Sequence, residues 1–132
     1  MASDLPFTVI RTVVDSEWTL TSVSWPNEPF TRPSGLEPWI SIEFPVSNWA
    51  PIEIGGATWN ECGVLWAHVY VRDGSGTLEG RILARRFLGL FRGRAEGGVS
   101  FGAATIGHEG RAEHDPYWVI SASVTWNSQE HP

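Results

Sequence analysis

Hydrophobic and polar residues alternate most clearly in residues 63–72 of this sequence. A period of two predicts a strand that buries one face, formed here by Leu65, Ala67, Val69 and Val71. A glycine-rich turn follows at residues 73–77, and we expect Thr77 to be the N-cap of a helix. The helix is indicated by apolar residues at helical spacing: Leu83, Phe87, Leu90 and Phe91. Residues 63–94 are therefore predicted to form a strand that leads into an amphipathic helix.

Shorter patterns predict the other elements. Pro6 in a first turn, followed by Phe7, Ile10 and Val14, indicates a short helix at the amino terminus. We expect strands at residues 23–26, 39–46, 51–56, 97–106 and 117–126, with a bulge where glycines interrupt residues 97–106. We expect a turn at residues 47–50, loops at residues 27–38 and 107–116, and a frayed polar tail at residues 127–132.

This order of elements predicts a fold class. A helix, several strands, a second helix and two more strands are typical of an α+β domain with a mostly antiparallel sheet. The sheet would pack against one or two helices. A length of 132 residues without an internal repeat or linker indicates one domain over residues 1–132.

Charge is distributed unevenly along the chain. The formal net charge is −6, and all nine basic residues are arginines. Residues 63–94 carry a local charge of about +4, which leaves about −10 for the remainder. A basic helix on an acidic body suits head-to-tail contacts between copies. We prefer such a subunit contact to a solvated helix face, and we place nucleic-acid binding third because the chain is acidic overall. The arginines in question are Arg81, Arg85, Arg86, Arg92 and Arg94.

Motifs for catalysis, cofactors or metals are weak or missing in the sequence. Cys62 is the only cysteine, which excludes an internal disulfide framework and a cysteine-based zinc cluster. His108-Glu109 and His114-Asp115 could hold a cation, but their spacing matches no known metal motif, and we interpret them as parts of a polar loop. His68 is expected to be a hydrogen-bonded sheet residue. We therefore expect no catalytic residue, no metal and no cofactor.

Targeting signals are not evident either. The apolar runs are shorter than the roughly 20 residues that a membrane span needs, and the amino terminus lacks the features of a signal peptide. The expected product is cytosolic, without a membrane partner.

The glycines of residues 73–77 could bind an anion at the start of the helix. A strand-to-helix turn needs these glycines for its geometry alone, and we prefer that interpretation.

Several short motifs occur in an order that resembles a known family. They are the Gly55-Gly56 turn, the strand and helix joined by Gly74 and Gly76, the segment Pro38-Trp39-Ile40 and the run Val23-Ser24-Trp25-Pro26-Asn27-Glu28-Pro29-Phe30. Together they cover most of the chain. This phage-related family is similar to the tail terminator proteins of lambda-type phages and of phage-like gene transfer agents. The sequence departs from the family in having no lysine and a β-branched first helix.

The resemblance implies a structural role. It implies an α+β subunit of a six-membered ring that caps the tail tube, stops its growth and offers the surface to which the head joins. The implied partners are copies of the chain, the tail tube protein, the head–tail connector protein and DNA passing through the lumen. The implied location is the tail of a virion or phage-like particle, assembled in the bacterial cytoplasm.

The resemblance also suggests which residues carry this role. For subunit or lumen contacts we expect Arg81, Arg85, Arg86 and Arg92. For anchoring the loop of residues 27–38 we expect Trp25, Phe30 and Trp39. Two alternatives stay open: a head–tail connector or tail tube component, and a small binding module or enzyme that uses His108, His114 and Cys62.

Overall fold

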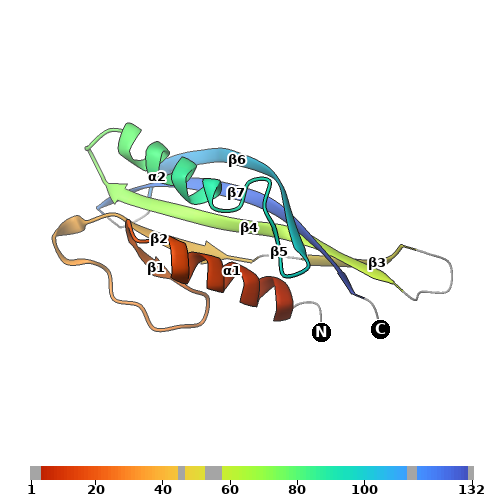
Figure 1. Cartoon of the computed structure of the whole chain (residues 1–132). Helices are drawn as coiled ribbons and strands as arrows, with labels where there is room; N and C mark the ends of the chain where they lie inside the picture. The colour runs from red at the N-terminus through yellow and green to blue at the C-terminus, as the bar shows by residue number, and fades with distance from the viewer. Residues whose placement is uncertain (1–3, 45–46, 53–57, 113–115, 131–132) are drawn as a thin grey trace.

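The computed structural model describes residues 4–44, 47–52, 58–112 and 116–130. Two α-helices and a seven-stranded sheet make up the fold, and both helices lie in front of the sheet in the view of Figure 1. The elements in chain order are α1 (Asp4–Glu17), β1 (Ser22–Ser24), a short 3-10 helix (Ser34–Leu36), β2 (Trp39–Glu43), β3 (Ser47–Pro51), β4 (Trp59–Arg72), α2 (Leu78–Gly89), β5 (Ala95–Glu96), β6 (Val99–Arg111) and β7 (Tyr117–Glu130).

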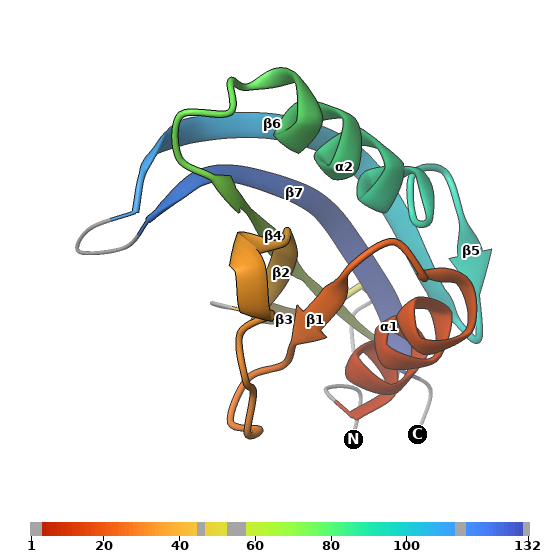
Figure 2. The ribbon, with the colours of Figure 1, turned by 90° about the vertical axis from the view of Figure 1, so that its left-hand side faces the viewer.

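Strand β4 is the centre of the sheet. It pairs along its whole length with β7, and its other edge is shared, with β3 paired to its first part and β2 to its second. The strand order is β1-β2-β4-β7-β6-β5, and every pairing is antiparallel except that of β1 with β2. Figure 2 shows how strongly β6 and β7 curve. The predicted α+β fold with a mostly antiparallel sheet is therefore confirmed.

The face of β4 that was predicted to be buried forms part of the hydrophobic core. Leu65 and Ala67 are each 1% exposed and Val69 and Val71 are fully buried. Residues of β7 complete this face of the sheet: Ile120, Ala122, Val124 and Trp126. Such alternation follows from the pleat, which points successive side chains to opposite faces.

Both helices cover this one face. Helix α1 contributes Val9, Ile10, Val13 and Val14 to the core, and α2 contributes Ala84, Phe87 and Leu88. The ring of Trp18, just after α1, meets the ring of Phe87 edge-on at 5.2 Å between centroids. The first helix therefore forms in spite of its β-branched residues because its apolar side chains are buried, and tertiary packing outweighs the local preference.

The turn between β4 and α2 has the geometry that its glycines allow. Gly74 and Gly76 adopt φ angles of 86° and 92°, which favour glycine. This supports the geometric interpretation of residues 73–77. Thr77 stands at the N-cap position, but its side chain does not cap the helix. Its hydroxyl instead donates to Oε1 of Glu109 at 2.8 Å, so the predicted N-cap position is confirmed although the side chain makes no capping bond.

Residues 47–50 form a strand and not the predicted turn. They belong to β3, whose residues pair one by one with the start of β4, from Ser47 opposite Gly63 to Pro51 opposite Trp59. Proline is tolerated here because it ends an edge strand, where a missing N–H group costs little. Of the strand predicted at residues 51–56, only Pro51 and Ile52 lie within the described residues.

Two further segments were predicted as irregular but lie in long strands. Residues 107–111 continue β6, and residues 127–130 continue β7 as partners of Trp59 to Cys62. Pairing with a long neighbouring strand outweighs the low strand preference of glycine and polar residues. The expected irregularity of β6 is confirmed by register shifts between Phe101 and Ala104 and between Ile106 and Glu109.

Candidate interaction surface

The exposed side of α2 combines apolar residues with arginines. Leu78 is 70% exposed and Ile82 is 45% exposed. Arg85, Arg86 and Gly89 are also exposed and follow at helical spacing. We call Leu78, Ile82, Arg85, Arg86 and Gly89 the outward face of α2. It lies opposite the buried side of the helix, so nothing in the described part of the chain covers it.

Arg81 is not part of this face. Its Nη2 lies 2.7 Å from Oε2 of Glu109 on β6, an ion pair that joins the first turn of α2 to the sheet. The hydrogen bond from the Thr77 hydroxyl is the largest effect that lowers the pKa of Glu109, and the Arg81 guanidinium lowers it further. The prediction grouped Arg81 with the contact arginines, and the structure shows that it makes an ion pair within the chain while its side chain stays 48% exposed.

Arg94 is also bound within the chain. Its Nη2 lies 2.6 Å from Oε2 of Glu17 and 3.3 Å from Oε1 of Glu96, and its Nη1 donates to the carbonyl oxygen of Leu90 at 3.1 Å. The hydrogen bond from Arg94 lowers the pKa of Glu17. Arg94 thus connects the end of α1, the end of α2 and β5, and it is not available for phosphates.

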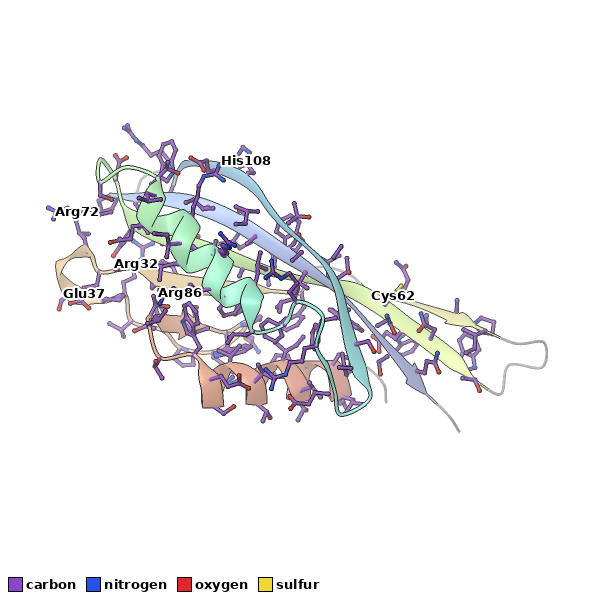
Figure 3. The ribbon with its side chains drawn as sticks, turned by 45° about the horizontal axis from the view of Figure 1, so that its top comes forward. Arg32, Glu37, Cys62, Arg72, Arg86 and His108 are labelled. Atoms are coloured by element: carbon purple, nitrogen blue, oxygen red, sulfur yellow. The ribbon has the colours of Figure 1, made fainter. Side chains whose placement is uncertain are left out.

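Of the five arginines from Arg81 to Arg94, three stay exposed without an ion pair in the described part of the chain: Arg85, Arg86 and Arg92. Figure 3 labels Arg86 on α2. Exposed guanidinium groups without an ion pair can bind a partner of opposite charge. They are therefore the charged part of a candidate contact surface.

Trp25, Phe30 and Trp39 pack in two separate places. Phe30 lies against Trp39 at 5.0 Å between ring centroids, and Trp39 stacks on Tyr70 of β4 at 4.0 Å. Trp25 lies instead below the guanidinium of Arg11, 4.5 Å from its carbon to the ring centroid. Trp25 and Trp39 are both buried, and Phe30 is half-buried. The two places lie near opposite ends of the loop of residues 27–38.

An exposed apolar extension of the sheet was not predicted from the sequence. We call it the arm, and it comprises β3, Ile52 and residues 59–62 at the start of β4. It reaches beyond both helices in Figure 1. Trp49 is 43% exposed, Ile52 is 52% exposed and Trp59 is 40% exposed. The signal in the sequence was Trp49 and Trp59, ten residues apart within residues 33–71, which contain no arginine or lysine.

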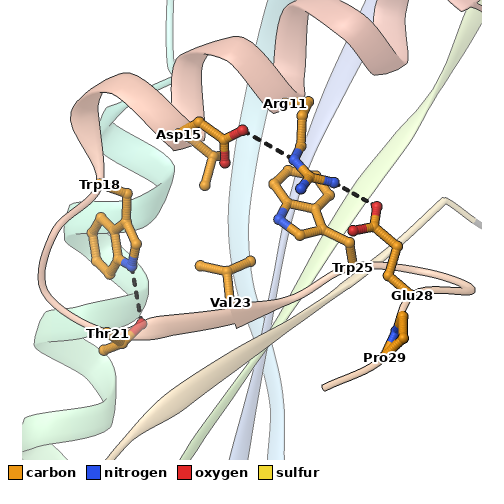
Figure 4. Close-up of a pocket in the computed structure, with 9 residues that line it drawn as sticks. Arg11, Asp15, Trp18, Thr21, Val23, Trp25, Glu28 and Pro29 are labelled. Carbon is orange, nitrogen blue, oxygen red and sulfur yellow. Dashed lines mark hydrogen bonds and ion pairs between the residues drawn. The ribbon is translucent and has the colours of Figure 1, made fainter. Parts of the chain in front are cut away.

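A cavity lies between α1 and β1, with a volume of about 340 Å³. Figure 4 shows its charged groups paired with one another: Arg11 Nε lies 3.1 Å from Asp15 and Nη1 lies 2.5 Å from Glu28. The indole N–H of Trp18 donates to the Thr21 hydroxyl at 2.9 Å. Because its polar groups satisfy one another, this cavity gives no indication of a ligand.

Ser121, His68 and Glu43 form a hydrogen-bonded row across β7, β4 and β2. Ser121 Oγ lies 2.8 Å from His68 Nδ1, and Glu43 Oε2 lies 3.3 Å from His68 Nε2. The three side chains lie on the pleated face away from the core. Ser121 is paired directly with His68, whereas Glu43 is paired with Trp66, two residues before His68. The row contains the residue types of a hydrolase triad, but it lies in the middle of paired strands, whose N–H groups are used in the sheet and cannot serve as oxyanion donors. It fits the expected hydrogen-bonded sheet histidine.

Other features of the described residues also bear on function. No group of three or more His, Cys, Asp or Glu among them could hold a metal ion. His114 and Asp115 lie outside the described residues, and Glu109 is engaged by Arg81 and Thr77. Within the described ranges, no helix is long and apolar enough to cross a membrane. Cys62 is exposed, as a free thiol on the arm.

Comparison with known proteins supports the fold. No family model and no curated protein sequence matches this chain. It is similar to a solved structure of a protein whose name states no activity, with 17% sequence identity and a TM-score of 0.66. The match covers 100% of this chain and 99% of the other. At this identity the similarity shows a shared fold.

Proposed function

We propose that this chain is an assembly subunit of a phage-type tail. Copies would close into a ring, most simply of six, that ends the tail tube and gives the head its joining surface. The order of motifs supports this proposal, and so does the α+β fold that the resemblance implied. The observation that carries it is the outward face of α2, which exposes Leu78 and Ile82 beside unpaired arginines on a chain of net charge −6.

Exposed apolar residues next to unpaired charge are typical of a protein contact. Exposed apolar patches on soluble proteins commonly mark interaction sites, and arginine is enriched in the residues that contribute most to binding. A basic face and an acidic remainder on one chain favour contacts between different surfaces of neighbouring copies. Such head-to-tail contacts give a ring when the rotation closes and a filament when it does not.

The same proposal names the other partners. The tail tube protein would contact one rim of the ring and the head–tail connector protein the other, in the tail of a virion or phage-like particle. DNA would pass through the lumen. Arg92, exposed just beyond α2, is a candidate for the lumen or for the subunit contact.

Electron cryo-microscopy of particles from the source organism tests this function. We expect one ring of this chain between tube and head. Rings stacked along the tail would make it a tube protein, and a location inside the portal would make it a connector. Its absence from every particle would refute an assembly role.

A charge reversal tests the surface that carries the proposal. We expect Arg85→Glu to lower the yield of particles with joined heads and tails by about tenfold or more, because like charges at a contact cost several kcal/mol. Arg72→Glu is the matched control. Arg72 is exposed at the last position of β4, outside α2, and its substitution changes the net charge by the same amount. Equal yields from both variants, with both proteins folded, would contradict the assignment of α2.

A further inference from the structure

We infer that the arm of one copy docks on the outward face of α2 of the next copy. This interface deepens the proposed function and rests on it, since it names the two surfaces that meet in the ring. Four observations lead to it: the uncovered apolar side of the arm, the charge of each surface, the residue types that would meet, and the separation of the two surfaces within one chain.

The arm continues the buried face of the sheet into solvent. Trp49 is paired with Glu61 and Pro51 with Trp59, so both tryptophans point to the side of β4 on which Leu65 is buried. Over the rest of the sheet this side is covered by α1 and α2, but the arm extends past them (Figure 1). Two large aromatic side chains therefore stay exposed on a face that is apolar elsewhere. A second protein surface would cover them.

The two surfaces differ in charge. The described arm contains no arginine or lysine, and its one carboxylate, Glu61, is only 2% exposed. The outward face of α2 carries Arg85 and Arg86, and Arg92 follows beyond the helix. Repulsion between these arginines would disfavour helix-to-helix contacts, whereas no basic residue of the arm opposes their approach.

The side chains also match in kind. Trp49 and Trp59 offer aromatic faces over which the guanidinium groups of Arg85 and Arg86 can stack. Ile82 and Leu78 provide apolar area for the indoles. Gly89 has open space where a side chain would be, because an added Cβ would meet nothing within 4 Å. A flat ring could therefore approach the helix backbone closely there.

The contact has to join two different copies. Figure 3 labels Cys62 on the arm and Arg86 on α2, and the two residues lie in separate parts of the molecule. The arm is fixed by its pairing with β4 and cannot bend back onto its own α2. Each copy therefore offers one arm and one helix face, which is the arrangement that a closed ring requires.

Site-directed cross-linking of the purified protein tests this interface. Pro51→Cys places a thiol on the tryptophan side of the arm, Gly89→Cys places one on the helix face, and Cys62→Ser removes the native thiol. With a short bis-maleimide, we expect a mixture of the two single-cysteine proteins to give a 51–89 linked dimer. One protein with both cysteines should give a covalent ladder that ends in a closed ring.

The matched control is Leu20→Cys in place of Gly89→Cys, since Leu20 is 51% exposed but lies between α1 and β1. We expect no 51–20 product beyond the background of random collision. In addition, Arg85→Glu should lower the 51–89 yield about tenfold, and Arg72→Glu should leave it unchanged. Circular dichroism would show that each variant is folded.

The outcomes separate this interface from the proposed function. Rings in particles together with no 51–89 product would overturn the interface and leave the proposed function standing. A cross-link from residue 51 to the tube or connector protein in particles, without the 51–89 product, would show that the arm binds that partner and would likewise overturn the interface. If no ring is found in particles and no 51–89 product forms, both proposals fail.

Discussion

Gly80 is the residue at which α2 lies against the sheet most closely. A Cβ built on it would collide with Cδ1 of Ile120 and lie 3.4 Å from Cγ2 of Val71, and both of these side chains are fully buried. Neither can move without disturbing the core. Glycine, although unfavourable inside a helix, is therefore required by packing.

A pair of substitutions on α2 measures this requirement. We expect Gly80→Val to lower the free energy of unfolding by about 1–3 kcal/mol, the usual cost of overpacking a core. Gly89→Val, on the open side of the same helix, should change it by less than about 0.5 kcal/mol. Urea unfolding followed by tryptophan fluorescence gives both values. A small effect of Gly80→Val would mean that α2 does not pack against the sheet as closely as described.

The carboxylate of Glu109 makes stability depend on pH. Its pKa lies below the ordinary 4.5 because the Thr77 hydroxyl and Arg81 bind the charged form, so the folded protein binds this proton less tightly than the unfolded chain. The resulting stabilisation is fully present above pH 4.5 and is lost as the pH falls through the lowered pKa. The attachment of α2 to β6 should therefore weaken in acid.

The comparison of wild type with Glu109→Gln at several pH values tests this. We expect the variant to unfold at lower urea than wild type at pH 7, and the difference to shrink as the pH falls below 4.5 and through the lowered pKa of Glu109. Glu37→Gln is the control, because Glu37 is an exposed carboxylate without an ion pair in the described part of the chain. A difference of constant size at all pH values would rule out the ionised Glu109 as its origin.

At the scale of elements, Arg11 attaches α1 to the segment that follows β1. Its guanidinium stacks over Trp25 and pairs with Asp15 on the helix and Glu28 in the loop. We expect Arg11→Ala to lower the free energy of unfolding by about 1 kcal/mol, the usual sum of a partly exposed ion pair and a cation–π contact. Arg11→Lys should recover only part of this loss, because an ammonium group cannot stack flat and bridge two carboxylates.

Urea unfolding measures these values, with Arg72→Ala as the control for loss of one positive charge. If Arg11→Ala and Arg72→Ala unfold at the same urea concentration, the stacking of Arg11 on Trp25 and its ion pairs contribute nothing measurable to the free energy of unfolding. If lysine replaces arginine without any loss, charge alone accounts for the effect.

Some elements could be predicted from local sequence and some could not. The alternation around Leu65 and the helical spacing around Phe87 fix strand β4 and helix α2, because each pattern is long and one-sided. Residues 47–50 were misassigned because Ser47 and Asn48 favour turns locally, and residues 107–111 because glycine and charged residues disfavour strands. Their strand form depends on pairing with β4 and β7, which are distant in the sequence.

Only part of the candidate surface could be predicted from the sequence. Helical spacing correctly placed Arg85 on the side away from the core. It could not show that Arg81 pairs with Glu109 or Arg94 with Glu17, because those partners lie 28 and 77 residues away. The arm was missed since the exposure of Trp49 depends on where the helices end in space.

At the scale of the whole molecule, the charge pattern predicts a salt dependence. We expect the proposed oligomer to dissociate as sodium chloride rises from about 0.1 to 1 M, because screening shortens from about 10 Å to about 3 Å. The unfolding temperature of the monomer should change little, since its core is apolar. Sedimentation velocity measures the first quantity and circular dichroism the second. An oligomer that tightens with salt would show that apolar contact dominates.

The place of β7 in the sheet has a consequence for how the protein is made. β7 is the last strand in the sequence, yet it lies between β4 and β6 and pairs with both. On a ribosome, β4 and β6 would therefore each have one edge of unpaired N–H and C=O groups until β7 emerges. Folding that depends on such distant pairings is slow. A nascent or prematurely ended chain could not present a finished subunit, so only complete chains would enter an assembly.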